Sequence, residues 1–342
     1  MTQVRIAKKT KEGLSLDVDF PIGPGVTAVV GPSGAGKTLV LDLIAGLATP
    51  DAGRILLNDA ILFDAAARVD VPPRRRAIGY IFQDSALFPH LTLERNVAFA
   101  AHDWPRLERH RRVGEMLERF DLASAAALRP EQATAVQRLR CTVARALIAE
   151  PKLLLIDDAG VGEAVLARVR ESFQDPIVLV TGDLDLCAAS ASQLMLLEAG
   201  RIVQRGVPRE VLDAPESIEA ARLLGIPNIF EVTIAALDPG RKSSRLEFAG
   251  FTLAGPYIPG HFRGDRVWIT VRPEALRVYG KAPERGENVV ETQLVHVWER
   301  VREVRLEFTG SIFADVAREE YLRLKDSKAW RVEFPAESLR VL

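Results

Sequence analysis

Several protein classes are excluded by what this sequence of 342 residues lacks. No uninterrupted apolar run approaches the roughly eighteen residues needed to cross a bilayer, and the polar start MTQVRIAKKTKEG does not look like a secretory signal. The formal net charge is only −1, with acidic and basic residues interspersed, so nothing marks a nucleic-acid-binding surface. We therefore expect a cytoplasmic protein with no nucleic-acid partner.

Cysteine and tryptophan are also scarce. The two cysteines, Cys141 and Cys187, lie in apolar, helix-like contexts without metal-ligand partners nearby in sequence, which favours core packing for both. Three of the four tryptophans, Trp268, Trp298 and Trp330, are expected in a core or an interface rather than in a base-stacking platform.

The length exceeds the usual size of one hydrophobic core and predicts two domains. Strand-like runs at 78–82, 153–157, 177–181 and 193–197 alternate with helical stretches at 108–120, 135–148 and 161–173, which indicates a layered α/β domain over residues 1–227. Helical signals crowd between residues 92 and 150, so we expect an inserted helical subdomain at about 84–150. From residue 228 to 342, short alternating runs and turn-rich pieces predict a small all-β, OB-like domain.

Residues 31–38 read GPSGAGKT, directly after the apolar run 26–30 and before a helical pattern. Strand, glycine loop and helix together form the context of a phosphate-binding loop. The glycines allow successive N–H groups to turn inward at a helix N-terminus, where the helix dipole also favours phosphate. Lysine supplies a point charge to the β and γ phosphates, and a threonine hydroxyl is a suitable Mg²⁺ ligand. The predicted nucleotide-binding residues are Gly31, Pro32, Ser33, Gly34, Ala35, Gly36, Lys37 and Thr38.

Further motifs carry a family resemblance. They are IGYIFQDSALFPHLTLERNVAF at 78–99, ARAL at 144–147, LLLID at 153–157 and VRPEALRV at 271–278. With the phosphate-binding loop, they make the chain similar to the ATP-binding subunits of ABC importers that carry a C-terminal TOBE region. FPIGPGVTAVVGPSGAGKT looks closest to molybdate-type importers, whereas VRPEALRV is nearer to sugar, polyamine and ferric-ion types.

The resemblance implies ATP and Mg²⁺ as ligands and assigns roles to single residues. Gln83 corresponds to the glutamine that contacts Mg²⁺ and the attacking water, and Asp157 to the aspartate that holds Mg²⁺ with Thr38. Read without the family, Gln83 is also compatible with a polar residue ending a strand, and Asp157 with a helix cap. Asp158 stands at the position of the catalytic base.

The resemblance also implies partners and a location. LFPHLT at 87–92 matches the stretch that builds the docking groove for a membrane permease, which predicts a subunit held peripherally on the inner face of the cell membrane. A second ATP-binding subunit is expected too, in a homodimer or a heterodimer. The run of three arginines at 74–76 is more simply explained as a solvated turn than as a phosphate or lipid site.

The chain departs from the family pattern at positions that perform hydrolysis. ATAVQ at 133–137 stands where LSGGQ belongs, so Ala135 and Val136 add Cβ atoms where backbone approaches phosphate. Asp158 is one methylene shorter than the usual glutamate, and Gly182 replaces the usual switch histidine. The first aromatic residue is Phe20, so no obvious side chain before the loop stacks on adenine.

Two functions follow from these observations. The first is a working importer ATPase that couples nucleotide-driven dimerisation and hydrolysis to transport. The alternative is a nucleotide-binding subunit with weak or no ATPase activity, acting as a heterodimer partner or regulator.

Overall fold

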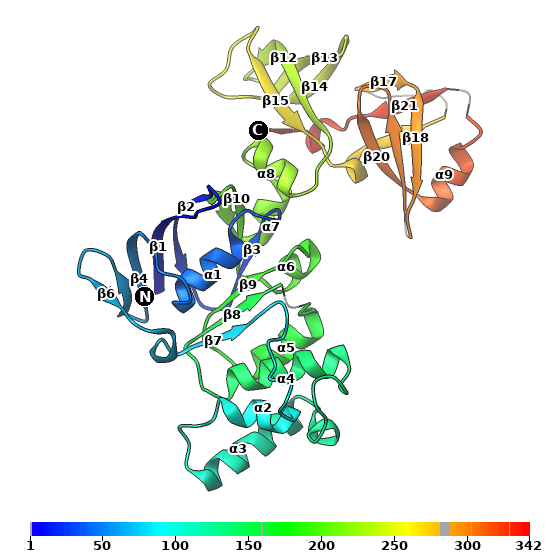
Figure 1. The fold of residues 1–342 in the computed structure, drawn as a ribbon. Coiled ribbons are helices and arrows are strands. Elements are labelled where there is room, and N and C mark those ends of the chain that lie inside the picture. Colours follow the sequence, from blue (N-terminus) through cyan, green and yellow to red (C-terminus); the bar gives the residue numbers. More distant parts are fainter. Residues whose placement is uncertain (1, 159, 281–287, 302, 328) are drawn as a thin grey trace. The chain divides into compact units, whose positions relative to one another are not determined.

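The computed structural model describes residues 2–158, 160–280, 288–301, 303–327 and 329–342. The chain forms two compact units, Met1–Leu212 and Asp213–Leu342 (Figure 1). The first unit is α/β and the second is almost entirely β, as the sequence predicts. The predicted domain boundary at 227 and 228 stays a prediction, and it falls after the short helix α8 (Ile218–Leu223).

One sheet organises the first unit. Its strand order is β6-β5-β4-β1-β2-β11-β10-β3-β9-β8-β7. The parallel part consists of β10, β3, β9, β8 and β7, and antiparallel pairing joins β1 to β2 and β4, and β4 to β5. The strands are β1 (Thr2–Lys9), β2 (Ser15–Ile22), β3 (Val26–Val30), β4 (Ala52–Leu57), β5 (Ala60–Asp64), β6 (Val69–Asp70), β7 (Ile78–Ile81), β8 (Leu153–Asp157), β9 (Ile177–Val180), β10 (Gln193–Glu198) and β11 (Arg201–Gly206).

Alternation along the central strands builds two cores, one on each face of the sheet. Leu153 and Leu155 of β8 pack in the core that contains the helix α1 (Lys37–Ala45), whereas Leu154 and Ile156 pack with the helical layer opposite. Successive side chains of a strand point to opposite faces, so a residue at position 157 faces the same side as Leu155. Because both faces are covered, β3 and β8 are buried along their whole length.

The helices up to residue 213 are α1 (Lys37–Ala45), α2 (Leu93–Phe99), α3 (Arg106–Arg119), α4 (Ala135–Leu147), α5 (Glu163–Ser172), α6 (Leu184–Ser190) and α7 (Pro208–Asp213). The segment between β7 and β8 supplies α2, α3 and α4, which Figure 1 shows gathered on one side of these strands. Thr92 caps α2 by accepting from the Arg95 amide, and Thr134 begins α4 with a reciprocal capping box to Gln137. The sequence predicted α4 at 135–148, within one residue of the observed end.

The arginine run at 74–76 is only partly a solvated turn. Arg74 and Arg75 are exposed, but the side chain of Arg76 is fully buried. Its guanidinium donates to the carbonyl oxygens of Leu43 and Ile44 at 3.0 and 2.7 Å, and pairs with Asp70 at 2.9 Å. The prediction was wrong for Arg76, because the C-terminal end of α1 leaves carbonyl groups that need a donor.

The second unit contains three sheets around one core. Their orders are β14-β13-β12-β15-β22, β16-β21-β17 and β18-β19-β20. The elements are β12 (Ile229–Asp238), β13 (Ser243–Phe248), β14 (Phe251–Pro256), β15 (Arg266–Thr270), β16 (Arg277–Tyr279), β17 (Val289–Thr292), β18 (Leu294–Glu299), β19 (Glu303–Phe308), β20 (Ile312–Ala317), α9 (Arg318–Leu324), β21 (Trp330–Glu333) and β22 (Arg340–Val341).

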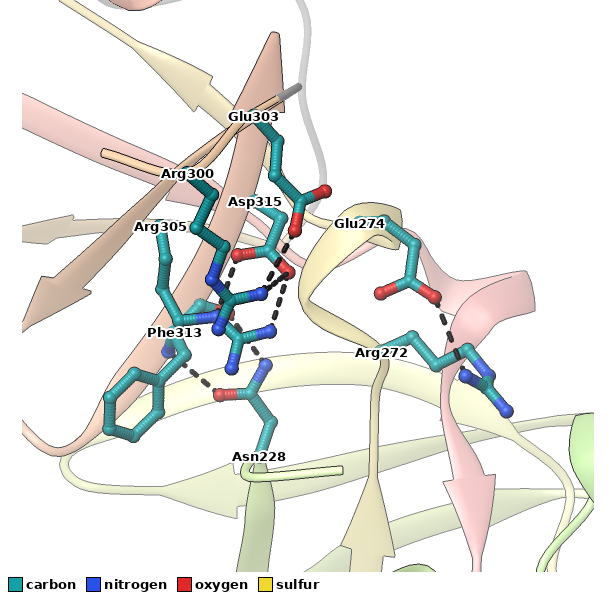
Figure 2. Close-up of polar contacts among 8 residues, drawn as sticks. All are labelled: Asn228, Arg272, Glu274, Arg300, Glu303, Arg305, Phe313 and Asp315. Atoms are coloured by element: carbon teal, nitrogen blue, oxygen red, sulfur yellow. Dashed lines mark hydrogen bonds and ion pairs between the residues drawn. The ribbon is translucent and has the colours of Figure 1, made fainter. Parts of the chain in front are cut away.

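Polar side chains tie two of these sheets together (Figure 2). The buried carboxamide of Asn228, just before β12, donates to the Phe313 carbonyl and accepts from the Phe313 amide, both at 2.7 Å. On β19 and β20, Arg305 forms two hydrogen bonds of 2.7 and 2.6 Å with Asp315, whose side chain is only 5% exposed. Hydrogen bonds from Asn228 therefore fix the start of β12 against β20.

The tryptophans divide between two environments. Trp330 is buried in the core, whereas Trp268 and Trp298 are 39% and 41% exposed. The two cysteines are buried and free.

Candidate functional site

The carboxyl ends of the parallel strands place four predicted site segments at one edge of the sheet. Gly31 follows β3, Gln83 lies just beyond β7, Asp157 closes β8 and Gly182 lies just beyond β9. The register pairs Val29 with Val180 and Val180 with Asp157, so these strand ends are level. In open α/β sheets, ligands bind outside this edge.

The phosphate-binding loop has the backbone that its glycines predict. Gly34 and Gly36 have φ values of 80° and 98°, in the left-handed region that glycine adopts without strain. Gly36 is also the N-cap of α1, and no side chain caps this helix end. The first amides of α1 are therefore available to an anion, and the helix dipole favours negative charge there.

The positive charge of Lys37 lies next to this loop and is not neutralised by a carboxylate of any described residue. Its Nζ donates to the carbonyl oxygens of Gly31 and Pro32 at 2.8 and 2.9 Å. No ion pair to Lys37 occurs within the part of the chain that the structure describes. A carbonyl group is a neutral acceptor, so the ammonium charge stays free to attract phosphate.

Asp157 lies on the face of β8 that α1 covers, and it is 5% exposed. Burial raises the pKa of Asp157, a hydrogen bond from the Thr38 side chain lowers it, the nearby Asp158 raises it, and Lys37 lowers it. The structure thus places two of the predicted metal ligands, Thr38 and Asp157, close enough for the Thr38 side chain to influence the pKa of Asp157. A partly desolvated carboxylate next to a hydroxyl is a donor pair that suits a hard cation.

The donor set fits Mg²⁺ bound together with a nucleotide. Among the described residues, no group of three or more His, Cys, Asp or Glu side chains converges on one point. Mg²⁺ characteristically takes one or two carboxylates and completes its shell with substrate phosphates and water. Thr38 and Asp157 satisfy that requirement beside the loop at 31–38.

Gln83 is placed differently from the other predicted ligands. It is exposed in a turn after β7, which the Ser85 amide closes by donating to the Phe82 carbonyl at 3.2 Å. No hydrogen bond of its side chain is present in the described structure. The metal-ligand role of Gln83 therefore stays a prediction.

Asp158 and Gly182 border an open hollow. Asp158 is exposed, has a φ of 39°, and its amide donates to the Val180 carbonyl at 3.0 Å. A cavity of about 480 Å³ is lined by both residues together with Val161 and Thr181. A Cβ atom added at Gly182 would meet no heavy atom within 4 Å, so a side chain at the switch position has room.

The segment at 133–137 forms the start of α4. Thr134 is its N-cap, Ala135 is the first helical residue, and Val136 is 54% exposed. The two Cβ atoms anticipated from the sequence therefore project from an exposed helix N-terminus.

Sequence reasoning missed a contact between α1 and β7. The Tyr80 hydroxyl donates to Asp42 at 3.0 Å, and burial raises the pKa of Asp42. Ile78 and Tyr80 pack against the core that contains α1, whereas Ile81 packs in the core on the opposite face of the sheet. This alternation along β7 is the sequence signal that Tyr80 faces α1. The identity of its partner is not evident from the sequence.

Comparison with known proteins agrees with this geometry. Residues 16–160 match the family model described as ABC transporter. The molybdenum import ATP-binding protein ModC of Rhodospirillum rubrum is 37% identical over 212 residues, which are 59% of this chain and 57% of that protein. The molybdate/tungstate import ATP-binding protein WtpC of Archaeoglobus fulgidus is 37% identical over 241 residues, 68% of this chain and 98% of that protein. The spermidine/putrescine import ATP-binding protein PotA of Vibrio cholerae is 33% identical, covering 77% of this chain and 71% of that protein.

Solved structures share the fold. An ATP-binding subunit of an ABC transporter superposes with a TM-score of 0.52 at 23% identity, covering 61% of this chain and 90% of that one. The cbiO1 protein of Clostridium perfringens, described as part of the ABC transporter complex cbiONQ, gives 0.53 at 24% identity, covering 65% and 94%. With a phosphate-binding loop at the strand edge and relatives of this similarity, the chain belongs to the ATP-binding proteins of the ABC transporter family.

Proposed function

We propose that this chain is the ATP-binding subunit of an ABC importer, which binds Mg-ATP and couples nucleotide-driven dimerisation and hydrolysis to transport through a membrane permease. One observation carries the proposal: an ammonium group hydrogen-bonded only to carbonyl oxygens lies beside an uncapped helix N-terminus. The names of the relatives, which are import ATP-binding proteins, support the same activity.

In this proposal each residue of the site has a distinct task. Lys37 exchanges its two carbonyl acceptors for phosphate oxygens, and the amides from Gly34 onward hold the remaining negative charge. Thr38, Gln83 and Asp157 would hold Mg²⁺, which would neutralise charge on the phosphates. Asp158 accepts a proton from the attacking water, which Gln83 orients.

The permease is proposed to dock beside residues 87–92. The Phe88 ring packs against Phe99 of α2 at 4.5 Å, and Phe99 is 58% exposed. Across the described residues, no helix is long and apolar enough to span a bilayer. We propose that the permease holds the subunit on the cytoplasmic face of the cell membrane.

An oxyanion of the molybdate type is our proposed solute. Two of the relatives described above carry molybdenum or molybdate/tungstate import in their names. A relative named for spermidine and putrescine import, and one from Rhodococcus jostii named for Fe(3+) import, are similar over comparable lengths. The relatives do not favour the alternative of a subunit with little turnover.

The test measures ATP turnover and solute uptake with the same variant. The subunit is co-expressed with its permease in vesicles, and ATP-dependent uptake of radiolabelled molybdate is compared between wild type and Lys37→Ala. We expect co-purification with the permease, and uptake that Lys37→Ala abolishes. ATP turnover or uptake unaffected by Lys37→Ala would contradict the nucleotide role, whereas spermidine or iron uptake in place of molybdate uptake would correct only the solute.

A further inference from the structure

The loop that carries Gln83 is held by the distal end of α4. Arg145, in the last turn of that helix, donates from Nη1 to the Ala86 carbonyl at 2.8 Å and from Nη2 to the Ser85 carbonyl at 3.2 Å. The Thr142 hydroxyl, one turn earlier, lies 3.0 Å from the same Ser85 carbonyl and 3.1 Å from the Arg138 carbonyl. Two side chains on one face of the helix thus form hydrogen bonds with two successive carbonyl groups of the loop.

The backbone that they grip is in a costly conformation. Ser85 and Ala86 have φ values of 53° and 45°, so two successive residues with a Cβ occupy the left-handed region. Such backbone persists only where surrounding contacts enforce it. The contacts from Arg145 and Thr142 fall on the carbonyl groups of these two residues, immediately after the turn that contains Gln83.

Arg145 has no competing anionic partner. It forms no ion pair within the described residues, and its guanidinium lies 5.7 Å from the centre of the Phe88 ring. Burial lowers the pKa of Arg145, although the side chain stays charged. A half-buried cation without a carboxylate is stabilised chiefly by the loop carbonyls, so displacing the loop is unfavourable.

The other end of α4 lies at the segment that replaces the family signature. Thr134, its N-cap, lies eleven residue steps before Arg145 along the continuous helix, about 16 Å at 1.5 Å per step. Rigid secondary elements can carry energetic coupling between distant sites. A displacement of the N-terminus of α4 can therefore be carried to the loop at Ser85 and Ala86.

We infer that Arg145 and Thr142 are positioning residues that set the place of Gln83 relative to the metal and that couple it to the position of α4. The inference rests on the proposed function, because it takes Gln83 as a ligand of nucleotide-bound Mg²⁺. Neither residue contacts the nucleotide-binding loop in any described hydrogen bond. Their effect is thus on metal-dependent binding, and not on the grip of Lys37 on phosphate.

The experiment measures ATP affinity by calorimetry in excess Mg²⁺ and again in EDTA. We expect Arg145→Ala to weaken binding in Mg²⁺ by about tenfold and Thr142→Val by about threefold, the range that loss of one or two hydrogen bonds gives, with binding in EDTA unchanged. Arg145→Lys, which keeps the charge, should recover part of the loss. Arg140→Ala is the matched control, because Arg140 lies on the same helix and pairs with Asp121 at 3.3 Å.

A double-mutant cycle separates positioning from general damage. In a Gln83→Ala background, Arg145→Ala should have no further effect on binding in Mg²⁺, since the side chain it positions is gone. An equal loss in EDTA, or a full loss in the Gln83→Ala background, would overturn the inference and leave the proposed function intact. Wild-type binding that does not require Lys37 would overturn both. Thr142→Val is isosteric, so it supplies a result even where Arg145→Ala does not fold.

Discussion

Two cationic side chains of the first unit differ in their partners from two of the second, although other cations of the first unit, such as Arg76, do pair with carboxylates. In the first unit, Lys37 and Arg145 donate to backbone carbonyl oxygens. In the second, Arg305 is bonded twice to Asp315, and Arg300 pairs with Glu303 at 2.9 Å (Figure 2). A carbonyl oxygen accepts the hydrogen bond but does not offset the positive charge. A carboxylate accepts the hydrogen bond and also offsets the charge. The comparison teaches that an arginine-rich cluster is not by itself an anion site.

The largest expected effect comes from breaking the cluster of the second unit. Asp315→Ala leaves Arg305 without its carboxylate in a mostly buried place and should lower the free energy of unfolding of that unit by about 3 kcal/mol. Chemical denaturation followed by tryptophan fluorescence measures it, since Trp330 lies in the same core. ATP affinity should not change.

A compensating pair serves as the control for this prediction. Replacing both partners, with Arg305→Met and Asp315→Leu, should recover most of the loss, because an apolar pair leaves no unpaired charge. A single variant that is as stable as the wild type would show that the cluster contributes nothing to the fold.

Removal of the Lys37 ammonium group in the first unit should reduce ATP affinity and leave the stability nearly unchanged, the opposite of what Asp315→Ala should do. Lys37→Ala should weaken ATP binding by about thirtyfold, roughly 2 kcal/mol, which is typical of hydrogen bonds to charged groups. Stability without nucleotide should change little, because the losses are two hydrogen bonds to carbonyl oxygens and an attraction to Asp157 that is the smallest influence on its pKa. Lys152→Ala, at a 60% exposed lysine of the same unit, is the matched control in calorimetry. Similar losses for both lysines would point to long-range charge instead of a local contact.

The pH dependence of stability at Asp157 tests whether a buried carboxylate without a paired cation among the described residues is costly in the first unit. Burial raises its pKa from the ordinary 3.8, so ionisation opposes folding, and stability decreases as pH rises through the raised pKa. Asp157→Asn removes this loss and should raise the unfolding temperature at neutral pH by about 2 °C, with little difference below pH 3.8. Mg²⁺-dependent ATP binding should weaken by about tenfold. A variant that is less stable at neutral pH would contradict the sign.

The smallest effect concerns the hollow beside Asp158. Because a side chain at Gly182 meets open space, Gly182→His should fold normally and raise ATP turnover by about threefold, far less than an essential acid–base group contributes. Gly182→Ala controls for the loss of backbone freedom. Turnover lowered by histidine and not by alanine would mean that the hollow must stay open.

Local patterns in the sequence were sufficient for the elements of the site. The boundaries of β3 and β8 agree with the apolar runs, because a strand buried on both faces reads as a continuous apolar segment. The glycines at 34 and 36 predict left-handed backbone, because a positive φ is a local requirement that glycine meets without strain. The fold class and the family followed from these elements and their spacing.

Contacts between distant segments were not readable in the same way. Arg76 looked like part of a solvated turn, and only packing against the end of α1 shows why it is buried. The grip of Arg145 on Ser85 and Ala86 joins residues about sixty positions apart, and the residue types alone do not specify it.

The sequence by itself determined the strands and the helix that carry the candidate site, the glycine-rich loop and the family, because each depends on residues that are neighbours along the chain. Only the tertiary structure decided which charges are cancelled and which are kept. Arg305 meets a carboxylate across a strand pair, whereas Lys37 and Arg145 meet carbonyl groups, and the free energy of a charge depends on partners that the fold brings close in space.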